Sequence, residues 1–200
     1  MVNDENTPRT RPERRDAARN RQRILDTAHK LFEQYGVEQV SMNQIATEAQ
    51  IGPGTLYRRY RNKGELCLDL IKDSIDLFFD DIEAYLQESE TVPAEQKLKE
   101  VISSFIRFRE KKAQLLTGVE ETKSIKSRAQ SPLYVELHQI FVQLFDEMTG
   151  REQKPYLHSA FKADMMLMAL SSDSYFFQKN VRGHSPQEIL NLLCSTFISD

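Results

Sequence analysis

Residues 41–66 read SMNQIATEAQIGPGTLYRRYRNKGEL, and this stretch decides the fold. It predicts two short helices separated by a tight turn. Ser41 and Gln44 have the spacing of a capping box, which opens the first helix. The second begins with Gly52 as N-cap and Pro53 at the first helical position, where the missing N–H of proline costs nothing. Two short helices joined by a turn, with the second helix basic, form a helix-turn-helix.

Segments on both sides of this motif have the apolar spacing of amphipathic helices. Before it, we expect a helix over 16–35, with Asp16 as N-cap and Gly36 as the glycine that ends it. After it, Asn62 and Glu65 form a second capping pair, which opens a longer helix. This longer helix covers residues 63–87. Further helices follow over residues 94–112, 113–121, 132–148, 155–180 and 185–199. The sequence therefore predicts an all-α protein with about nine helices.

Composition and charge divide the chain into three parts. Residues 1–15 are polar, rich in Arg and broken by proline, and we expect a flexible basic arm. The predicted helix-turn-helix domain then covers 16–62, and a larger helical bundle covers 63–200. Residues 1–64 hold 12 Lys and Arg against 8 Asp and Glu, whereas the rest holds 15 against 22, so the net charges are +4 and −7. A basic end on an acidic body suggests an anionic partner.

The sequence lacks the patterns of several classes of protein. The chain has no apolar run long enough to span a membrane and no signal-peptide pattern, so we expect a cytoplasmic protein. Cys67 and Cys194 are predicted to be buried free thiols. Neither a metal-ligand pattern nor a catalytic constellation is found, and no cofactor is expected. Carboxylate pairs such as Glu120-Glu121 are interpreted as solvated faces.

The second short helix has two distinct faces. Leu56 and Tyr60 are four residues apart and are expected to pack inward against the first short helix. Thr55, Arg58 and Arg59 share another face, which points to solvent or into the major groove of DNA.

Residues Arg21–Leu66 resemble the DNA-binding domain of the tetracycline-repressor (TetR) family. One position departs from the family pattern, because Gln50 stands in the turn where glycine is usual. If this residue needs a left-handed backbone, Gln costs about 1 kcal/mol relative to Gly. The positions that carry the resemblance are Ile24, Leu25, Ala28, Phe32, Gly36, Ser41, Ile45, Ala46, Ala49, Gly54, Thr55, Leu56, Tyr57, Tyr60, Asn62, Lys63, Glu65 and Leu66.

The resemblance implies a role for each matched polar residue. Thr55, Tyr57 and Lys63 would contact DNA phosphates. Arg58 and Arg59 would read guanine edges. Three residues near the starts of the two short helices complete the predicted interface: Asn43, Gln44 and Pro53. Arginines ahead of the motif would follow phosphates or enter the minor groove: Arg14, Arg15, Arg19 and Arg21.

The resemblance also implies a homodimer formed through the last two helices, here 155–180 and 185–199. Their apolar positions exceed what one buried face needs, which fits burial against a second copy, although a thicker monomer core explains them too. A twofold protein matches a palindromic operator.

The C-terminal domain is expected to bind an apolar or amphipathic small molecule, whose binding would release a repressor from its operator. An activator or a recruiter of a protein partner, and a helical module that no longer binds DNA, are the alternatives that the sequence leaves open. The candidate pocket residues are Phe105, Phe108, Leu115, Tyr134, Phe141, Met165 and Tyr175.

Overall fold

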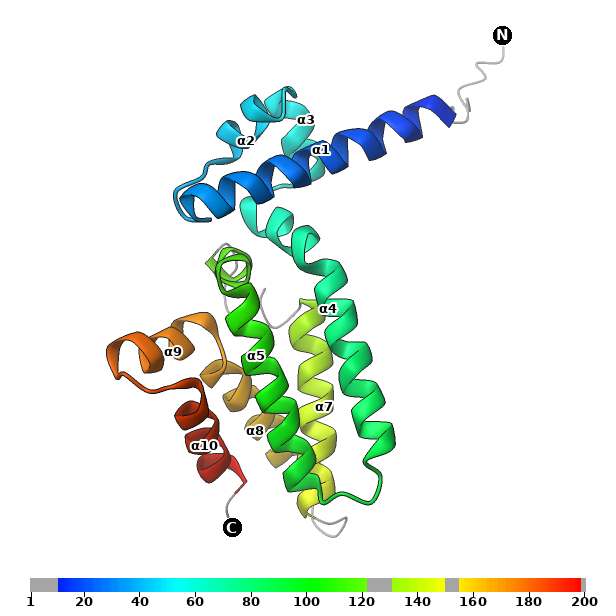
Figure 1. Cartoon of the computed structure of the whole chain (residues 1–200). Helices are drawn as coiled ribbons and strands as arrows, with labels where there is room; N and C mark the ends of the chain where they lie inside the picture. The colour runs from blue at the N-terminus through cyan, green and yellow to red at the C-terminus, as the bar shows by residue number, and fades with distance from the viewer. Residues whose placement is uncertain (1–10, 122–130, 150–154, 199–200) are drawn as a thin grey trace.

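The computed structural model describes residues 11–121, 131–149 and 155–198, and every regular element within these ranges is helical. The molecule has two parts in Figure 1. The first three helices form a small unit at one end, and the remaining helices form a larger bundle. The expected all-α architecture is confirmed. The bounds in the small unit are Arg11–Tyr35 for α1, Met42–Glu48 for α2 and Pro53–Arg59 for α3.

The first helix, α1, begins earlier than expected. Asp16 lies inside it, so its predicted role as N-cap is wrong, and residues 11–15 of the expected arm are helical. Residues 1–10 lie outside the described ranges. Residues 11–20 are rich in Arg and Ala, which favour helix without an apolar stripe, and Pro12 is tolerated in the first turn. The other end is as predicted, since Gly36 has φ +81° and its N–H donates to the Phe32 carbonyl at 2.9 Å.

The predicted caps of the next helices are present. The Ser41 Oγ accepts from the Gln44 N–H at 3.1 Å, and Asn62 Oδ1 accepts from the Glu65 N–H at 2.9 Å. The Glu65 carboxylate in turn accepts from the Arg61 N–H, one residue before the cap. Each cap satisfies a backbone N–H that would otherwise lack a partner at the start of the helix.

The turn between α2 and α3 uses a left-handed residue. Gln50 has φ +52°, which is the left-handed backbone conformation. Gln therefore carries the expected cost of about 1 kcal/mol relative to Gly at this position. The Ile51 N–H donates to the Ala46 carbonyl at 3.0 Å and closes the turn. Buried side chains from all three helices then hold the unit together: Ile24, Leu25, Ala28, Leu31, Phe32, Met42, Ile45, Ala46 and Leu56.

The bundle begins with two long antiparallel helices, α4 (Lys63–Glu88) and α5 (Ala94–Glu121), which run side by side in Figure 1. The backbone of α5 is kinked at Lys112, which has φ −119° and ψ 20°. The kink falls at the boundary that the sequence predicts between helices over 94–112 and 113–121.

Beyond the kink, α5 lies against the small unit at a close contact. A Cβ placed on Gly118 would lie 2.7 Å from Cys67 Sγ of α4 and 2.7 Å from a methyl group of Val37, in the loop after α1. Only glycine fits this approach without a shift. The second part of α5 therefore joins the bundle directly to the small unit.

The remaining helices are α7 (Pro132–Thr149), α8 (Pro155–Ala169), α9 (Ser172–Phe176), the π-helical turn η1 (Phe177–Val181) and α10 (Pro186–Phe197). The single helix predicted over 155–180 is wrong, because the chain breaks after α8. Ser171 starts a new helix there by accepting from the Ser174 N–H.

The start of α10 agrees with the sequence. Ser185 forms a full capping box with Glu188, and Pro186 stands in the first turn. Cys67 is buried as predicted, whereas Cys194 is only half-buried, and neither forms a disulfide within the part of the chain that the structure describes. Among the helices of the described ranges, none combines the length and the apolar character that a membrane span requires.

Candidate functional site

The helix α3 presents a polar face to solvent. Leu56 is fully buried and Tyr60 is 4% exposed, so the predicted inward face is confirmed. Tyr57 is 44% exposed, and Arg58 and Arg59 are both exposed. Because Leu56 and Tyr60 anchor the helix, the side chains between them are held at the surface of the small unit.

The other residues predicted to meet DNA frame this face. Asn43 and Pro53 are exposed, and Gln44 and Thr55 are half-buried. Ser41 is the N-cap of α2, and Gly52 is the N-cap of α3. The arrangement places hydroxyl, amide and guanidinium groups around one helix of about two turns, which suits the width of a DNA major groove. The DNA contacts themselves stay predictions.

Lys63 at the start of α4 is half-buried and bonded to the protein backbone. Its ammonium group donates to the carbonyl oxygens of Val37, Glu38 and Val40, the last two at 3.2 and 3.1 Å. An ammonium group has three donors, so these bonds engage all of them. Its predicted contact with phosphate stays a prediction, and the observed bonds order the loop that leads into α2.

Arg21 of the small unit is likewise paired within the protein. Its guanidinium forms a two-bond ion pair with the Asp69 carboxylate of α4, with Nε donating at 2.9 Å, and the Tyr60 hydroxyl donates to the same carboxylate. Arg19 is exposed on α1, whereas the side chains of Arg14 and Arg15 lie outside the described part. Sequence reasoning missed Asp69, which carries no local signal of its partners in α1 and α3.

A polar cluster lies in the core of the bundle, around Arg109 of α5. This arginine is fully buried, and its guanidinium donates to Glu120 Oε1 at 3.1 Å and to the Ser172 hydroxyl at 2.6 Å. The Tyr134 hydroxyl donates to Glu120 Oε1 at 2.7 Å, and the Ser172 N–H donates to Oε2 at 2.8 Å. The interpretation of Glu120 as a solvated carboxylate is therefore wrong. Its side chain ties both parts of α5 to α7 and α9.

Aromatic rings surround the Arg109 guanidinium. Its central carbon lies 5.2 Å from the centre of the Phe105 ring and 6.0 Å from that of Tyr175, within range of a cation–π interaction. Burial and the nearby Glu120 charge raise the pKa of Tyr134, and burial and Glu110 raise that of Tyr175. Both phenols thus stay protonated. Among the described residues, neither Arg109 Nε nor the Tyr175 hydroxyl has a hydrogen-bond partner, which leaves two buried donors available in the cluster.

The structure brings together three of the predicted pocket residues. Phe105, Tyr134 and Tyr175 meet around Arg109. Phe108 adjoins this group, since its ring centre lies 6.4 Å from that of Phe105 and 5.0 Å from that of Phe78 in α4. Of the other predicted residues, Phe141 is buried in α7 and Met165 is half-buried in α8.

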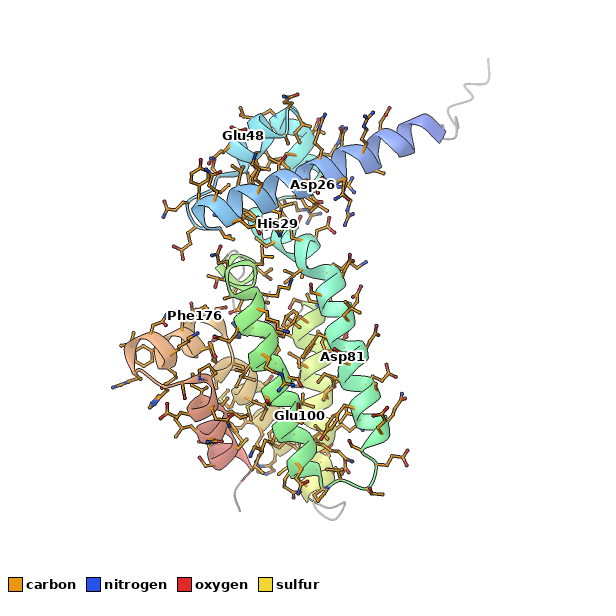
Figure 2. The ribbon with its side chains drawn as sticks, viewed as in Figure 1. Asp26, His29, Glu48, Asp81, Glu100 and Phe176 are labelled. Atoms are coloured by element: carbon orange, nitrogen blue, oxygen red, sulfur yellow. The ribbon has the colours of Figure 1, made fainter. Side chains whose placement is uncertain are left out.

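Leu115 lines a different hollow, between α1 and the kink of α5, with a volume of about 570 Å³. Most of its walls are polar, and they include His29 of α1, which faces the bundle in Figure 2. The sequence contains a signal for the Arg109 cluster that was not used, because Arg109 continues the apolar stripe of Ile102 and Phe105 at helical spacing.

Metal binding finds no support in the described ranges, where no group of three or more His, Cys, Asp or Glu side chains could hold an ion.

Comparison with known proteins identifies relatives along most of the chain. The family model described as bacterial regulatory proteins, tetR family, matches residues 24–70. An HTH-type transcriptional regulator of Staphylococcus aureus is 34% identical over 188 residues, which cover 94% of this chain and 97% of that protein.

Solved structures share the fold at lower identity. FadR of Thermus thermophilus, a TetR-family repressor in complex with lauroyl-CoA, has a TM-score of 0.66 at 16% identity and covers 89% of this chain and 93% of its own. FadR of Bacillus subtilis, in complex with stearoyl-CoA, has a TM-score of 0.62 at 18% identity and covers 89% and 97%. At these identities the likeness concerns the fold alone.

Proposed function

Because the chain belongs to the tetR family of bacterial regulatory proteins, we propose that it is a homodimeric repressor released from a palindromic operator by a small molecule. It is a transcriptional regulator, and nothing in its family indicates catalysis. Since its target is the bacterial chromosome, it acts in the cytoplasm.

The exposed face of α3 is the observation that carries the proposal. Leu56 and Tyr60 fix the helix to the core, while Tyr57, Arg58 and Arg59 stand at the surface. In this proposal Thr55 and Tyr57 bind phosphates and set the register of the helix in the groove. Arg58 and Arg59 read base edges, because a guanidinium matches guanine O6 and N7 with two hydrogen bonds.

Selection of binding sites from random DNA, followed by titration of the selected operator, tests this assignment. Arg58→Ala or Arg59→Ala should relax the preference at one base pair and cost about 1–3 kcal/mol there. Tyr57→Phe should weaken binding to all sequences alike. Arg107→Ala is the matched control, since Arg107 is an exposed arginine of α5 in the bundle. An unchanged selection profile in both α3 arginine variants would refute the base-reading role.

We place the effector in the core of the bundle, near Arg109. An acceptor atom on an apolar or amphipathic molecule would satisfy Arg109 Nε, and the Phe105 and Tyr175 rings would contact its apolar part. Two solved structures with this fold hold acyl-CoA molecules, which supports a long apolar ligand as the first class to test.

Release would follow from a shift between two tilts of α4. A ligand that prefers one tilt shifts the balance only by its differential affinity, typically about 1–3 kcal/mol. Lauroyl-CoA and stearoyl-CoA should raise the melting temperature and weaken operator binding, both in proportion to occupancy. A rise in melting temperature with unchanged operator affinity would contradict the proposed release, because the molecule would bind without affecting DNA binding.

The dimer interface is proposed on α8 and α10. Phe161 and Met168, seven residues apart on α8, are 63% and 50% exposed, and Leu192 on α10 is 49% exposed. Large apolar side chains on adjoining helices favour burial against a second copy.

A further inference from the structure

We propose that Asp69 is a positioning residue for DNA recognition, which holds Arg21 of α1 and Tyr60 at the end of α3 against α4. The proposal rests on the proposed function, because the geometry it controls is that of the α3 face. In this proposal Arg21 does not contact DNA phosphates, because its positive charge is paired with Asp69.

The contacts join three helices at one carboxylate. Arg21 donates to both Asp69 oxygens, in the two-bond geometry that suits a guanidinium and a carboxylate. The Tyr60 hydroxyl donates to Oδ2, the same oxygen that accepts from Arg21 Nε. The Asp69 side chain is 20% exposed and that of Arg21 36% exposed, so the pair is only partly accessible to water and salt.

Tyr60 gives the cluster its link to recognition. It is the C-terminal cap of α3, directly after Arg58 and Arg59, and its ring is buried. The Arg59 guanidinium lies 5.9 Å from the centre of this ring. A shift of the Tyr60 hydroxyl therefore moves the end of α3 that carries both arginines.

Titration behaviour agrees with this geometry. Burial alone would raise the pKa of Asp69, but the hydrogen bonds from Arg21 and Tyr60 and the Arg21 charge outweigh it and lower the pKa. Burial and the hydrogen bond to Asp69 raise the pKa of Tyr60. The carboxylate is charged and the phenol protonated at neutral pH, as the contacts require. Asp73, one turn further along α4, adds a second negative charge that favours the charged form of Arg21.

The sign of one substitution separates this role from its alternative. As a surface carboxylate near DNA, Asp69 would repel phosphates, and Asp69→Asn would strengthen binding. As a positioning residue, its loss frees Tyr60 and the end of α3, and operator affinity should fall about two- to tenfold. Binding to random DNA should change less, because it depends on charge more than on the placement of α3.

The salt dependence of binding tests Arg21 in the full-length protein. Each phosphate contact contributes about 0.9 to the slope of log affinity against log salt concentration. Arg58→Gln and Arg59→Gln measure how much this slope changes when a cation is lost from the exposed α3 face. Arg21→Gln should weaken operator binding and leave the slope at the wild-type value. The matched control on α1 is Arg19→Gln, which removes an exposed arginine without touching Asp69.

Tyr60→Phe keeps the buried ring and removes only the hydroxyl, so it guards against misfolding of the charge variants. It should lower operator affinity in the same direction as Asp69→Asn, while the melting temperature falls only as far as the loss of one part-buried hydrogen bond requires. Stronger binding by Asp69→Asn, or a slope reduced by about 0.9 in Arg21→Gln, would overturn the inference and leave the proposed function intact. A wild-type protein that binds no DNA would overturn both.

Discussion

At the scale of single residues, Asp69 also links stability to pH. Its pKa is lowered in the folded protein, so the folded state prefers the charged carboxylate. This stabilisation is complete above the ordinary carboxyl pKa of about 4 and is lost as pH falls through the lower folded value.

The free energy of unfolding of wild type and Asp69→Asn, measured by urea titration between pH 7 and pH 3, checks this. Wild type should be more stable at pH 7, and the difference should shrink as the solution becomes acidic. Asp76→Asn is the control, because it removes a carboxylate from an exposed position of the same helix. A gap that widens toward low pH would contradict the prediction.

At the scale of elements, the close approach of α5 and α4 depends on Gly118. Gly118→Ala should lower the free energy of unfolding by about 1–3 kcal/mol, because the added methyl group meets Cys67 and Val37. It should also change operator affinity, since the contact lies where the bundle meets the small unit.

The double variant Cys67→Ala/Gly118→Ala should recover part of the lost stability by removing one of the two obstacles. Gly54→Ala is the contrasting control, because nothing lies within 4 Å of the added atom in α3. Alanine should stabilise that helix by about 0.5–1 kcal/mol. Urea unfolding and operator titration measure both effects, and equal effects of the two substitutions would refute the packing argument.

The Arg109–Glu120 pair holds four helical segments together, and its charges depend on each other. Arg109→Met should cost about 3–5 kcal/mol, because it removes a buried positive charge that pairs with the Glu120 carboxylate. The double variant Arg109→Met/Glu120→Gln removes both charges and should cost less than the sum of the two single variants. Chemical denaturation of the four proteins completes the cycle, and strict additivity would show that the pair is not coupled.

At the scale of the whole molecule, operator binding should depend on the second copy. Phe161→Glu or Leu192→Glu places a charge on the proposed interface of α8 and α10 and should yield monomers in sedimentation experiments. Operator affinity should then fall about 100-fold or more, since two half-sites are no longer bound together. Leu77→Glu is the control, because Leu77 is 64% exposed on α4, which lies across the bundle from α10 in Figure 1. Dimeric variants that bind DNA normally would place the interface elsewhere.

The charge distribution is a property of the whole molecule as well. The acidic residues of the bundle include Asp81, an exposed residue of α4 that is labelled in Figure 2. With +4 on residues 1–64 and −7 on the remainder, the field favours approach to DNA by the small unit.

The sequence by itself determined the elements whose signals act within a few residues. The caps at Ser41, Asn62 and Ser185, the glycine at Gly36 and the kink at Lys112 all appear where the sequence predicts them. A cap forms with a backbone group three residues away, so its partner is fixed by the chain itself. The exposed face of α3 follows in the same way from helical spacing and two buried anchors.

Two errors in the predicted elements have local causes. The break after α8 was missed because apolar spacing continues across it, although Ser171 supplies the cap of a new helix. The early start of α1 was missed because polar residues with high helix propensity leave no apolar pattern.

Only the tertiary structure decided which charged groups find each other. Arg21 and Asp69 are 48 residues apart in the chain, and Arg109 and Ser172 are 63 apart. Sequence reasoning assigned Arg21 to DNA and Glu120 to solvent, since a charged side chain on a helix is most often at the surface. Burial makes an unpaired charge costly, so the packed helices select the partners, and no local pattern encodes that choice.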